Sequence, residues 1–347
     1  MQALTVIAGL ADSAALIEMP EPPLADGPIL VETIEVGICG TDAEICNGDL
    51  GRNPPACDRL VIGHEVIGRV LEAADVPGFQ IGDLLVGIVR RPDDVPCAHC
   101  AQGEWDMCRT GGFTERGIRG RHGFASERFR IRPQYAIAIP DSLGAAGVLL
   151  EPASVVAKAW EHIDAIGRRA WWGRQTVVVT GAGSIGLLTA LMAVQRGHEV
   201  HVVDIVADAM KPQLVADLGA SYHHGSVGEM AARADVVIEC TGAISVIAEV
   251  MGAEPKGVVC LIGVTSPDQH APVDVGRLSR WLVHNNAVVF GIVNANRRHY
   301  LDALTSLTTA DRDWLARLVT RRVPLPQWQD ALHRRPEDVK TVLHFAD

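Results

Sequence analysis

The chain has 347 residues, 48% of them hydrophobic, and a net charge of -11, which leaves material for two globular domains. The acidic balance disfavours a protein that binds nucleic acid or an anionic membrane. No basic segment precedes an early apolar stretch, and no uninterrupted apolar run reaches about 18 residues. We therefore expect neither a secretory signal nor a membrane span, and we expect the protein in the cytoplasm.

The first 150 residues are typical of a β-rich domain. Short strand-like segments are divided by glycine and proline turns, as at 29–35, 66–72 and 83–89. The chain holds eight cysteines. In a large cytoplasmic protein, cysteines are more often metal ligands or core residues than disulfide partners.

Dispersed polar residues in this region have the composition of a catalytic metal site. Cys39 lies two residues before Thr41, and His64 and Glu65 follow about 25 residues later. A thiolate, an imidazole and a carboxylate together leave room for water or substrate on zinc. Each piece alone is also typical of an ordinary surface or core residue.

A second group is compact. Cys97, Cys100 and Cys108 have the spacing of a closed structural zinc site, which needs four ligands. Asp94 repeats the spacing between the first two cysteines, so we predict it as the fourth ligand, with His99 as a competitor. The alternative is a loop of three thiols without metal.

The middle of the chain alternates strand-like and helix-like segments, which predicts a parallel sheet covered by helices. One predicted helix, 184–195, ends near Gly197, and a later helix ends near Gly219. The predicted strands are 176–180, 200–204, 236–240, 258–263 and 288–292. Beyond about Arg297 the pattern is helical again, with amphipathic stretches at 300–307 and 314–320.

The first of these strands leads into a dinucleotide-binding motif. Gly181 permits a tight turn, Gly183 lets a pyrophosphate approach the backbone, and Gly186 lets helix and strand pack closely. The helix N-terminus offers unpaired N–H groups to phosphates. Asp204, about 20 residues on, ends the next strand and can bind the adenosine ribose. A glycine-rich turn without a ligand is the alternative. The remaining residues assigned to this site are Ser184, Ile185, Gly263 and Val264.

These motifs, in this order and spacing, resemble the zinc-dependent medium-chain alcohol dehydrogenase superfamily. The stretches 114–118, 122–124, 150–152 and 293–300 are most similar to its glucose (aldose) 1-dehydrogenases. The resemblance implies an α/β fold: a GroES-like β-rich catalytic domain over 1–152, a Rossmann doubly wound parallel sheet over 153–290, and a return to the catalytic domain over 291–347. It also implies an active site in the cleft between the domains.

Site roles follow from matched positions. Cys39, His64 and Glu65 would hold the catalytic zinc, with Glu151 as a mobile fourth ligand or a partner of a sugar hydroxyl. Thr41 would lie on the proton path. Glu115 and Asn294 would contact the sugar. Two residues depart from the family pattern: Asp94 replaces a cysteine, and Val89 stands where some relatives carry an asparagine that contacts substrate.

The resemblance predicts oxidation of a sugar hydroxyl, most simply at C1 of D-glucose or a related aldose, with hydride transfer to NAD(P)+. We expect NAD+ to be favoured, because Asp204 would repel a 2′-phosphate. The partner is a small sugar or polyol, and family members are commonly dimers or tetramers, so we expect a homo-oligomer. The alternatives are a zinc-dependent polyol, cyclitol or amino-alcohol dehydrogenase, or a zinc-free quinone reductase or NAD(P)-binding protein.

Overall fold

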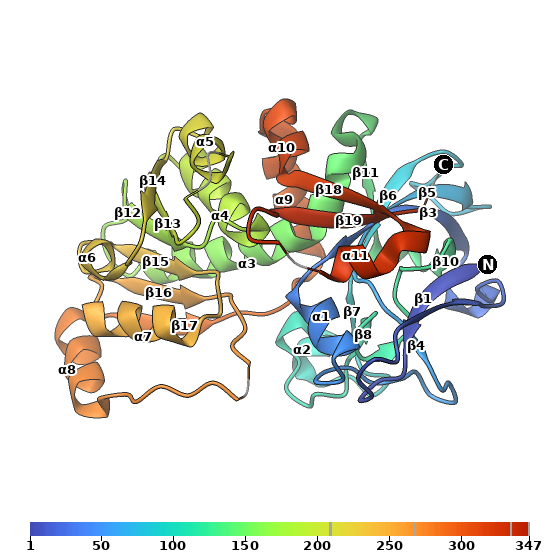
Figure 1. Cartoon of the computed structure of the whole chain (residues 1–347), viewed down its shortest axis with the longest axis horizontal. Coiled ribbons are helices and arrows are strands. Elements are labelled where there is room, and N and C mark those ends of the chain that lie inside the picture. The colour runs from blue at the N-terminus through green and yellow to red at the C-terminus, as the bar shows by residue number, and fades with distance from the viewer. Residues whose placement is uncertain (208–209, 267, 334, 346–347) are drawn as a thin grey trace. The chain divides into compact units, whose positions relative to one another are not determined.

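The computed structural model describes residues 1–207, 210–266, 268–333 and 335–345. The chain divides into two compact units (Figure 1). Unit 1 combines Met1–Ser154 with Asn294–Asp347, and unit 2 is the continuous segment Val155–Val293. The domain boundaries placed from the sequence, after residues 152 and 290, lie within three residues of these divisions.

Unit 1 is built around a seven-stranded sheet with the strand order β11-β6-β5-β3-β19-β18, and β10 also pairs with β3. The sheet unites segments from both ends of the sequence, because β19 pairs antiparallel with β3 and parallel with β18. Its strands are β3 (Ile29–Ile38), β5 (Glu65–Glu72), β6 (Leu84–Gly87), β10 (Arg128–Ile131), β11 (Ala136–Ile139), β18 (Val319–Pro324) and β19 (Lys340–His344).

Two three-stranded sheets complete the β-structure of unit 1, with the orders β2-β1-β4 and β7-β8-β9. Their strands are β1 (Gln2–Val6), β2 (Ala15–Glu18), β4 (Leu60–Val61), β7 (Arg90–Arg91), β8 (Thr114–Arg116) and β9 (Gly120–Arg121). The α-helices of this unit are α1 (Gly40–Cys46), α2 (Ala98–Ala101), α9 (Arg297–Thr309), α10 (Arg312–Leu318) and α11 (Trp328–Leu332). Short 3₁₀ helices cover Leu24–Asp26, Trp105–Met107, Pro133–Tyr135, Asp141–Leu149 and Leu325–Gln327.

The core of unit 1 explains one glycine of its main sheet. Phe124 and Phe129 are both buried and meet edge to face, with ring centroids 4.7 Å apart. A side chain at Gly87, the last residue of β6, would meet the Phe124 ring at 2.3 Å. Aromatic packing therefore requires glycine here, since well-packed cores do not absorb an added carbon without strain.

Unit 2 has the parallel sheet that the alternating pattern predicts. Its strand order is β14-β13-β12-β15-β16-β17, which is the 3-2-1-4-5-6 order of a dinucleotide-binding Rossmann sheet. The strands are β12 (Thr176–Thr180), β13 (Glu199–Asp204), β14 (Ser221–His224), β15 (Val236–Glu239), β16 (Val258–Leu261) and β17 (Val288–Gly291). The helices are α4 (Ser184–Gln195), α5 (Met210–Asp217), α6 (Gly228–Ala231), α7 (Ile244–Ala253) and α8 (Val275–Asn285), and α3 (Leu150–Gly167) begins in unit 1 and continues into unit 2.

The prediction of a helical tail beyond about Arg297 is wrong in part. Helices α9 and α10 form where expected, but α10 ends at Leu318 and the chain turns directly into strand β18. Val319 and Val323 are buried in that strand, and Val342 and Leu343 are buried in β19. The pairing of β18 with β19 outweighs the local helical pattern, because the preference for a strand is decided mainly by packing.

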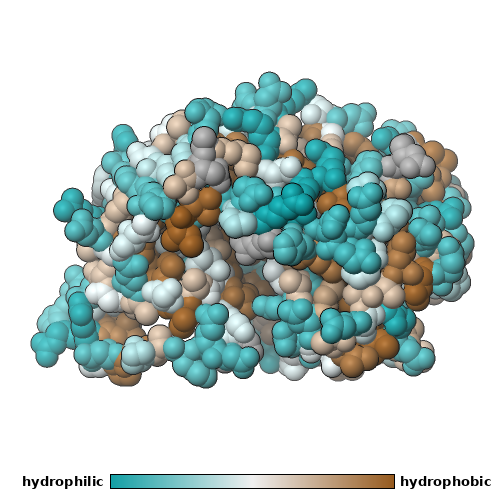
Figure 2. All heavy atoms as spheres, viewed as in Figure 1, coloured by the Kyte–Doolittle hydropathy of each residue, from teal (hydrophilic) through white to brown (hydrophobic). Residues whose placement is uncertain are grey.

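One helical segment among the described residues, Asp141–Gly167, is long and apolar enough to cross a membrane by composition alone. However, 72% of its most apolar window is buried inside the protein, as in a core helix. On the face shown in Figure 2, apolar residues form patches among hydrophilic ones. These features are those of a packed globular core.

Candidate functional site

Cys39 lies at the junction between strand β3 and helix α1. It is the N-cap residue of α1, and its backbone N–H donates to Asp42 Oδ2 over 3.0 Å. This capping arrangement satisfies a donor that the helix leaves unpaired at its start. Thr41 lies in the first turn of the same helix and is half-buried. The local sequence therefore fixes the thiol and the hydroxyl in one turn.

His64 and Glu65 enter the site from the start of strand β5. The Cys39 Sγ lies 3.2 Å from His64 Nε2, and the donor atoms of Cys39, His64 and Glu65 all lie within 4.8 Å of one another. On the other side of the ring, His64 Nδ1 lies 3.5 Å from Asp42 Oδ1. A carboxylate behind a ligating histidine orients the ring, so the donor set fits a catalytic zinc.

The charges in this cluster depend on one another. Burial would raise the pKa of Asp42, but the adjacent His64 lowers that pKa overall. Burial would likewise lower the pKa of His64, but the charges of Cys39 and Asp42 raise it well above its ordinary value. The sulfur of Cys39 and the carboxylate of Asp42 thus lie on either side of the His64 ring. A divalent cation would replace the proton in that arrangement.

Lys340 on strand β19 binds the third residue of the cluster. Its Nζ lies 2.8 Å from Glu65 Oε1 and 2.6 Å from Glu65 Oε2, and both side chains are buried. Gly37, opposite Glu65 on β3, makes room for the carboxylate, since a Cβ there would meet Glu65 Oε2 at 2.1 Å. The sequence analysis did not find Lys340, whose partner lies 275 residues away.

Glu151 lies in the first turn of helix α3, beside this cluster. It is buried, and burial together with the Glu65 charge raises its pKa to about 7, against the opposing charges of His64 and Lys340. Its carboxylate does not join the three-residue donor group. Buried Tyr300 lies close by, and burial together with the charge of Glu151 raises the pKa of its hydroxyl well above the ordinary value. A carboxyl group with this pKa changes charge near neutrality and can move a proton or bind a cation.

The two residues predicted to contact the sugar are brought together. Asn294 Nδ2 donates to Glu115 Oε1 over 3.0 Å, although the two residues lie 179 positions apart. Both are buried. Asn294 has a left-handed backbone with φ of 60°, an uncommon conformation that asparagine tolerates better than most residues.

The cysteine lobe brings together three of its four predicted ligands. Cys97, Cys100 and Cys108 form a group of donor atoms within 4.8 Å of one another, but Asp94 is exposed and lies outside it. Cys97 is the N-cap residue of α2, and Cys100 lies in its first turn. His99 is also outside the group and faces Glu104 at 3.9 Å. The assignment of Asp94 as the fourth ligand stays a prediction.

The thiols of the lobe differ in acidity. Backbone N–H groups, that of Arg109 foremost, hold the pKa of Cys97 at about 6. A hydrogen bond from Thr110 lowers the pKa of Cys108, while burial raises the pKa of Cys100 to about 12. Hydrogen bonds from loop N–H groups favour thiolates, which are the metal-binding form.

In unit 2, the glycine motif has the geometry that its sequence predicts. Gly181 has φ of 84°, and a Cβ at Gly186 would meet the Gly181 carbonyl oxygen at 1.8 Å. A Cβ at Gly183 would meet nothing within 4 Å, so its surroundings are open. Asp204 accepts from the backbone N–H groups of Ala182, over 2.5 Å, and Val206, over 2.9 Å. The carboxylate thus supports the glycine turn as well as standing at the end of β13.

The carboxyl edge of the parallel sheet gathers the other nucleotide residues. Ser184 and Ile185 form the first turn of α4, and Gly263 and Val264 follow β16. Buried Glu239, which the sequence analysis missed, accepts from Thr180 Oγ1 over 3.0 Å and from the backbone N–H of Thr241 over 2.7 Å. Its signal is an acidic residue that ends an otherwise apolar strand.

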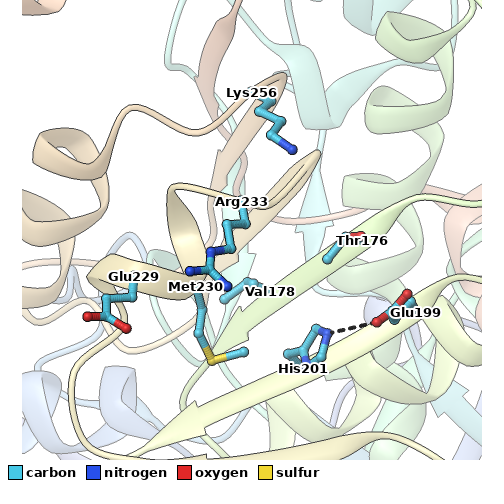
Figure 3. Close-up of a pocket in the computed structure, with 8 residues that line it drawn as sticks. All are labelled: Thr176, Val178, Glu199, His201, Glu229, Met230, Arg233 and Lys256. Carbon is cyan, nitrogen blue, oxygen red and sulfur yellow. Dashed lines mark ion pairs between the residues drawn. The ribbon is translucent and has the colours of Figure 1, made fainter.

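A separate pocket of about 460 Å³ lies at the opposite, amino edge of this sheet (Figure 3). Thr176 and Glu199 begin their strands there, and the Glu199 carboxylate pairs with His201 over 3.3 Å. Ligands of open α/β sheets bind outside the carboxyl ends of the strands. The pocket is therefore not part of the nucleotide site.

Comparison with known proteins places this geometry in a family. The family model for the glucose dehydrogenase C-terminus matches residues 144–345, and that for the alcohol dehydrogenase GroES-like domain matches residues 25–141. The chain belongs to the glucose dehydrogenase family. The resemblance read from the motifs and the predicted combination of a GroES-like domain with a Rossmann sheet are thereby confirmed.

Similar proteins span the whole chain. The glucose 1-dehydrogenases of Methanocella arvoryzae and Thermoproteus tenax are 35% and 36% identical, each over 99% of both chains. The structure of Haloferax mediterranei glucose dehydrogenase, in complex with NADP, Zn and gluconolactone, is 32% identical, covers 100% of both chains and superposes with a TM-score of 0.90. The family relationship therefore extends to both units of this chain.

Proposed function

We propose that this protein is a zinc-dependent dehydrogenase that oxidises C1 of D-glucose or a related aldose to the lactone, with NAD(P)+ as hydride acceptor. The donor group of Cys39, His64 and Glu65 carries the proposal, because it is a mixed sulfur, nitrogen and oxygen set of the kind that catalytic zinc takes. The full-length relatives named glucose 1-dehydrogenase support the choice of substrate.

The chain's own residues would divide the work. Cys39, His64 and Glu65 hold the metal, and Glu151 offers a further carboxylate beside them. When bound, zinc polarises the sugar hydroxyl and the nicotinamide accepts the hydride. Thr41 carries the hydroxyl proton away, and Glu115 and Asn294 orient the sugar through hydrogen bonds that an analogue without the matching hydroxyl lacks. Unit 2 binds the dinucleotide at the glycine turn.

The test is a screen of aldoses and polyols with each nicotinamide cofactor, following the absorbance of the reduced cofactor. We expect D-glucose or a close aldose to react fastest, and His64→Ala to abolish turnover while the dinucleotide still binds. His270→Ala, at an exposed histidine of unit 2, is the matched control and should keep full activity. Full activity of the His64 variant, or of metal-stripped protein, would disprove the metal assignment.

A polyol or cyclitol is the second candidate substrate, because Val89 is buried and apolar where some relatives place an asparagine. A hydrophobic side chain there removes one hydrogen bond to the sugar and relaxes discrimination. Faster oxidation of a polyol than of any aldose in the same screen would favour this reading.

We further propose that the enzyme acts in the cytoplasm as a homo-oligomer, a dimer or a tetramer, on a small sugar and without nucleic-acid or membrane partners. The net charge of -11 supports the exclusion of nucleic acid. Light scattering coupled to size-exclusion chromatography measures the oligomeric state. A single monomeric mass at working concentration would rule the oligomer out.

A further inference from the structure

The carboxylate of Glu115 is held by a buried arginine. Arg90 on β7 and Glu115 on β8 face each other in register, with 6% and 9% of their surfaces exposed. Both Arg90 Nε and Arg90 Nη2 lie 3.0 Å from Glu115 Oε1. The guanidinium also stacks on the Phe113 ring, 3.9 Å from its centroid. A buried, bonded and stacked guanidinium has little freedom to turn.

All the bonds to this carboxylate fall on one oxygen. Arg90 and Asn294 Nδ2 together direct three N–H donors at Glu115 Oε1. Within the described residues, Glu115 Oε2 receives none, yet it is not among the fully buried atoms that lack a partner, so it keeps accessible surface. The carboxylate therefore has one saturated oxygen and one free oxygen.

The far side of the arginine is anchored as well. Arg90 Nη1 donates to the Asp106 carbonyl oxygen over 3.1 Å. Asp106 belongs to the cysteine lobe, and its Oδ1 accepts from Asn296 Nδ2 over 2.8 Å. Asn294 and Asn296 both precede helix α9, so one polar network joins β7, β8, the lobe and the start of α9. Removing Arg90 would leave the Glu115 carboxylate held by Asn294 alone, a single bond about which it can turn.

We propose that Arg90 is a positioning residue for substrate recognition. It fixes Glu115 so that Oε2 accepts from one hydroxyl of the sugar, and it acts only through that carboxylate. The inference rests on the proposed aldose oxidation. A carboxylate that accepts a hydrogen bond in a fixed direction selects one hydroxyl, because a misaimed acceptor loses both strength and specificity.

The test compares D-glucose with its monodeoxy analogues in four proteins: wild type, Arg90→Met, Glu115→Gln and the double variant. In wild type, removal of one particular hydroxyl should lower kcat/KM far more than removal of the others. Arg90→Met should lower kcat/KM for glucose by about tenfold to hundredfold, mainly through KM, and should abolish the penalty for that one hydroxyl. Glu115→Gln should affect the same hydroxyl. The kcat/KM of the double variant should be no lower than that of the less active single variant.

Two further variants separate positioning from damage to the fold. Arg119→Met is the matched control, since Arg119 also lies over the Phe113 ring, at 4.9 Å, without a side-chain bond to Glu115. It should behave as wild type. Arg90→Lys keeps the charge but not the fork of donors, and should recover part of the selectivity. If Arg90→Met unfolds, Arg90→Lys and the double variant, which carries no unpaired buried charge, decide the matter.

Equal losses for all analogues, or additive losses in the double variant, would overturn the proposal. If wild type oxidises no aldose, the proposed function fails, and crystal structures of wild type and Arg90→Lys decide the positioning role alone. The Glu115 carboxylate should then be ordered in wild type and displaced or disordered in the variant. An unchanged carboxylate in the variant would overturn the role of Arg90.

Discussion

Lys340 is one of four lysines in a chain with 27 arginines, and its ammonium lies between the two oxygens of Glu65. The burial of Lys340 would lower its pKa, but the charge of Glu65 raises that pKa overall. A compact ammonium can meet both oxygens of one carboxylate from a single point, which a planar guanidinium does with two separate nitrogens. The pair thus neutralises Glu65 beside Cys39 and His64.

We predict that Lys340→Met destabilises the metal-free protein by about 3–5 kcal/mol, because Glu65 then remains buried without a counterion. Adding Glu65→Gln to this variant should restore most of the loss, since the unpaired charge disappears. Urea unfolding, followed by circular dichroism, measures both. Lys256→Met, at an exposed lysine, serves as the control. A double variant no more stable than Lys340→Met would contradict the ion pair as the source of stability.

Sequence reasoning found the residues whose neighbours form motifs and missed those whose partners are distant. Cys39, His64 and Glu65 stand in recognisable short patterns. Lys340 and Arg90 stand in ordinary strands, and only the tertiary structure shows that each faces a buried carboxylate. The sequence signal of Lys340 is a cation in the mostly apolar segment Val339–Leu343, where burial of a charge demands a partner.

At the scale of elements, the cysteine lobe carries a prediction about metal content. If the three thiols bind a second zinc, the protein should contain about two zinc ions per chain, and Cys100→Ser should lower this to about one and reduce thermal stability. Elemental analysis and thermal melts measure the two effects. Cys57→Ser, at an exposed cysteine outside the lobe, should change neither. Wild-type protein with one zinc, lost on His64→Ala, would mean that the lobe is empty.

The glycine turn of unit 2 carries a prediction about the cofactor. Asp204 places a carboxylate at the end of β13, where we propose that the adenosine ribose binds, so we expect wild type to prefer NAD+. Asp204→Ala should lose much of this preference, as measured by the ratio of kcat/KM for NAD+ and NADP+. Because Asp204 also supports the turn, Asp204→Asn, which keeps one acceptor, separates charge from structure. A wild type that prefers NADP+ would show that the carboxylate does not exclude the 2′-phosphate.

The two units differ in how well their helices and strands could be predicted from the sequence. The parallel strands of unit 2 are short apolar runs bounded by turns, and β12 spans the residues predicted for it. The tail of unit 1 was harder to predict, because β19 pairs with β3, some 300 residues earlier in the sequence, and β18 pairs in turn with β19. A short stretch of sequence shows the amphipathic spacing near Trp314. It does not show the sheet in which the following residues are paired.

At the scale of the whole molecule, each unit contains one histidine that makes its stability depend on pH. His122 Nδ1 in unit 1 accepts from the Val61 N–H, and His198 Nδ1 in unit 2 accepts from the Gln175 N–H, both over 3.2 Å. An accepting ring nitrogen must be unprotonated. Burial lowers the pKa of both side chains below the ordinary 6.5. The unfolded chain therefore binds more protons than the folded one just below that pH.

We predict that His122 and His198 contribute a fall in melting temperature as the pH decreases below about 6.5, because both become protonated on unfolding, whereas Glu151, with its raised pKa, contributes in the opposite direction. Differential scanning fluorimetry across a pH series measures the slope. His198→Asn cannot be protonated and should flatten the slope, whereas His270→Asn, at an exposed position, should not. Identical slopes in wild type and the His198 variant would contradict this account.

The main sheet of unit 1 can be completed only late in synthesis, after strand β19 has been made. Unit 2 is complete in sequence by residue 293, whereas β19, between β3 and β18, is made about 50 residues later. During translation, β3 therefore has an unpaired edge, and Glu65 has no ion pair with Lys340, until β19 has been made. Open strand edges are templates for aggregation. A chain released before residue 340 is made would contain a complete unit 2 joined to a main sheet with an unpaired, aggregation-prone edge. The last strand to be made therefore protects the nascent chain from aggregation and also completes the site.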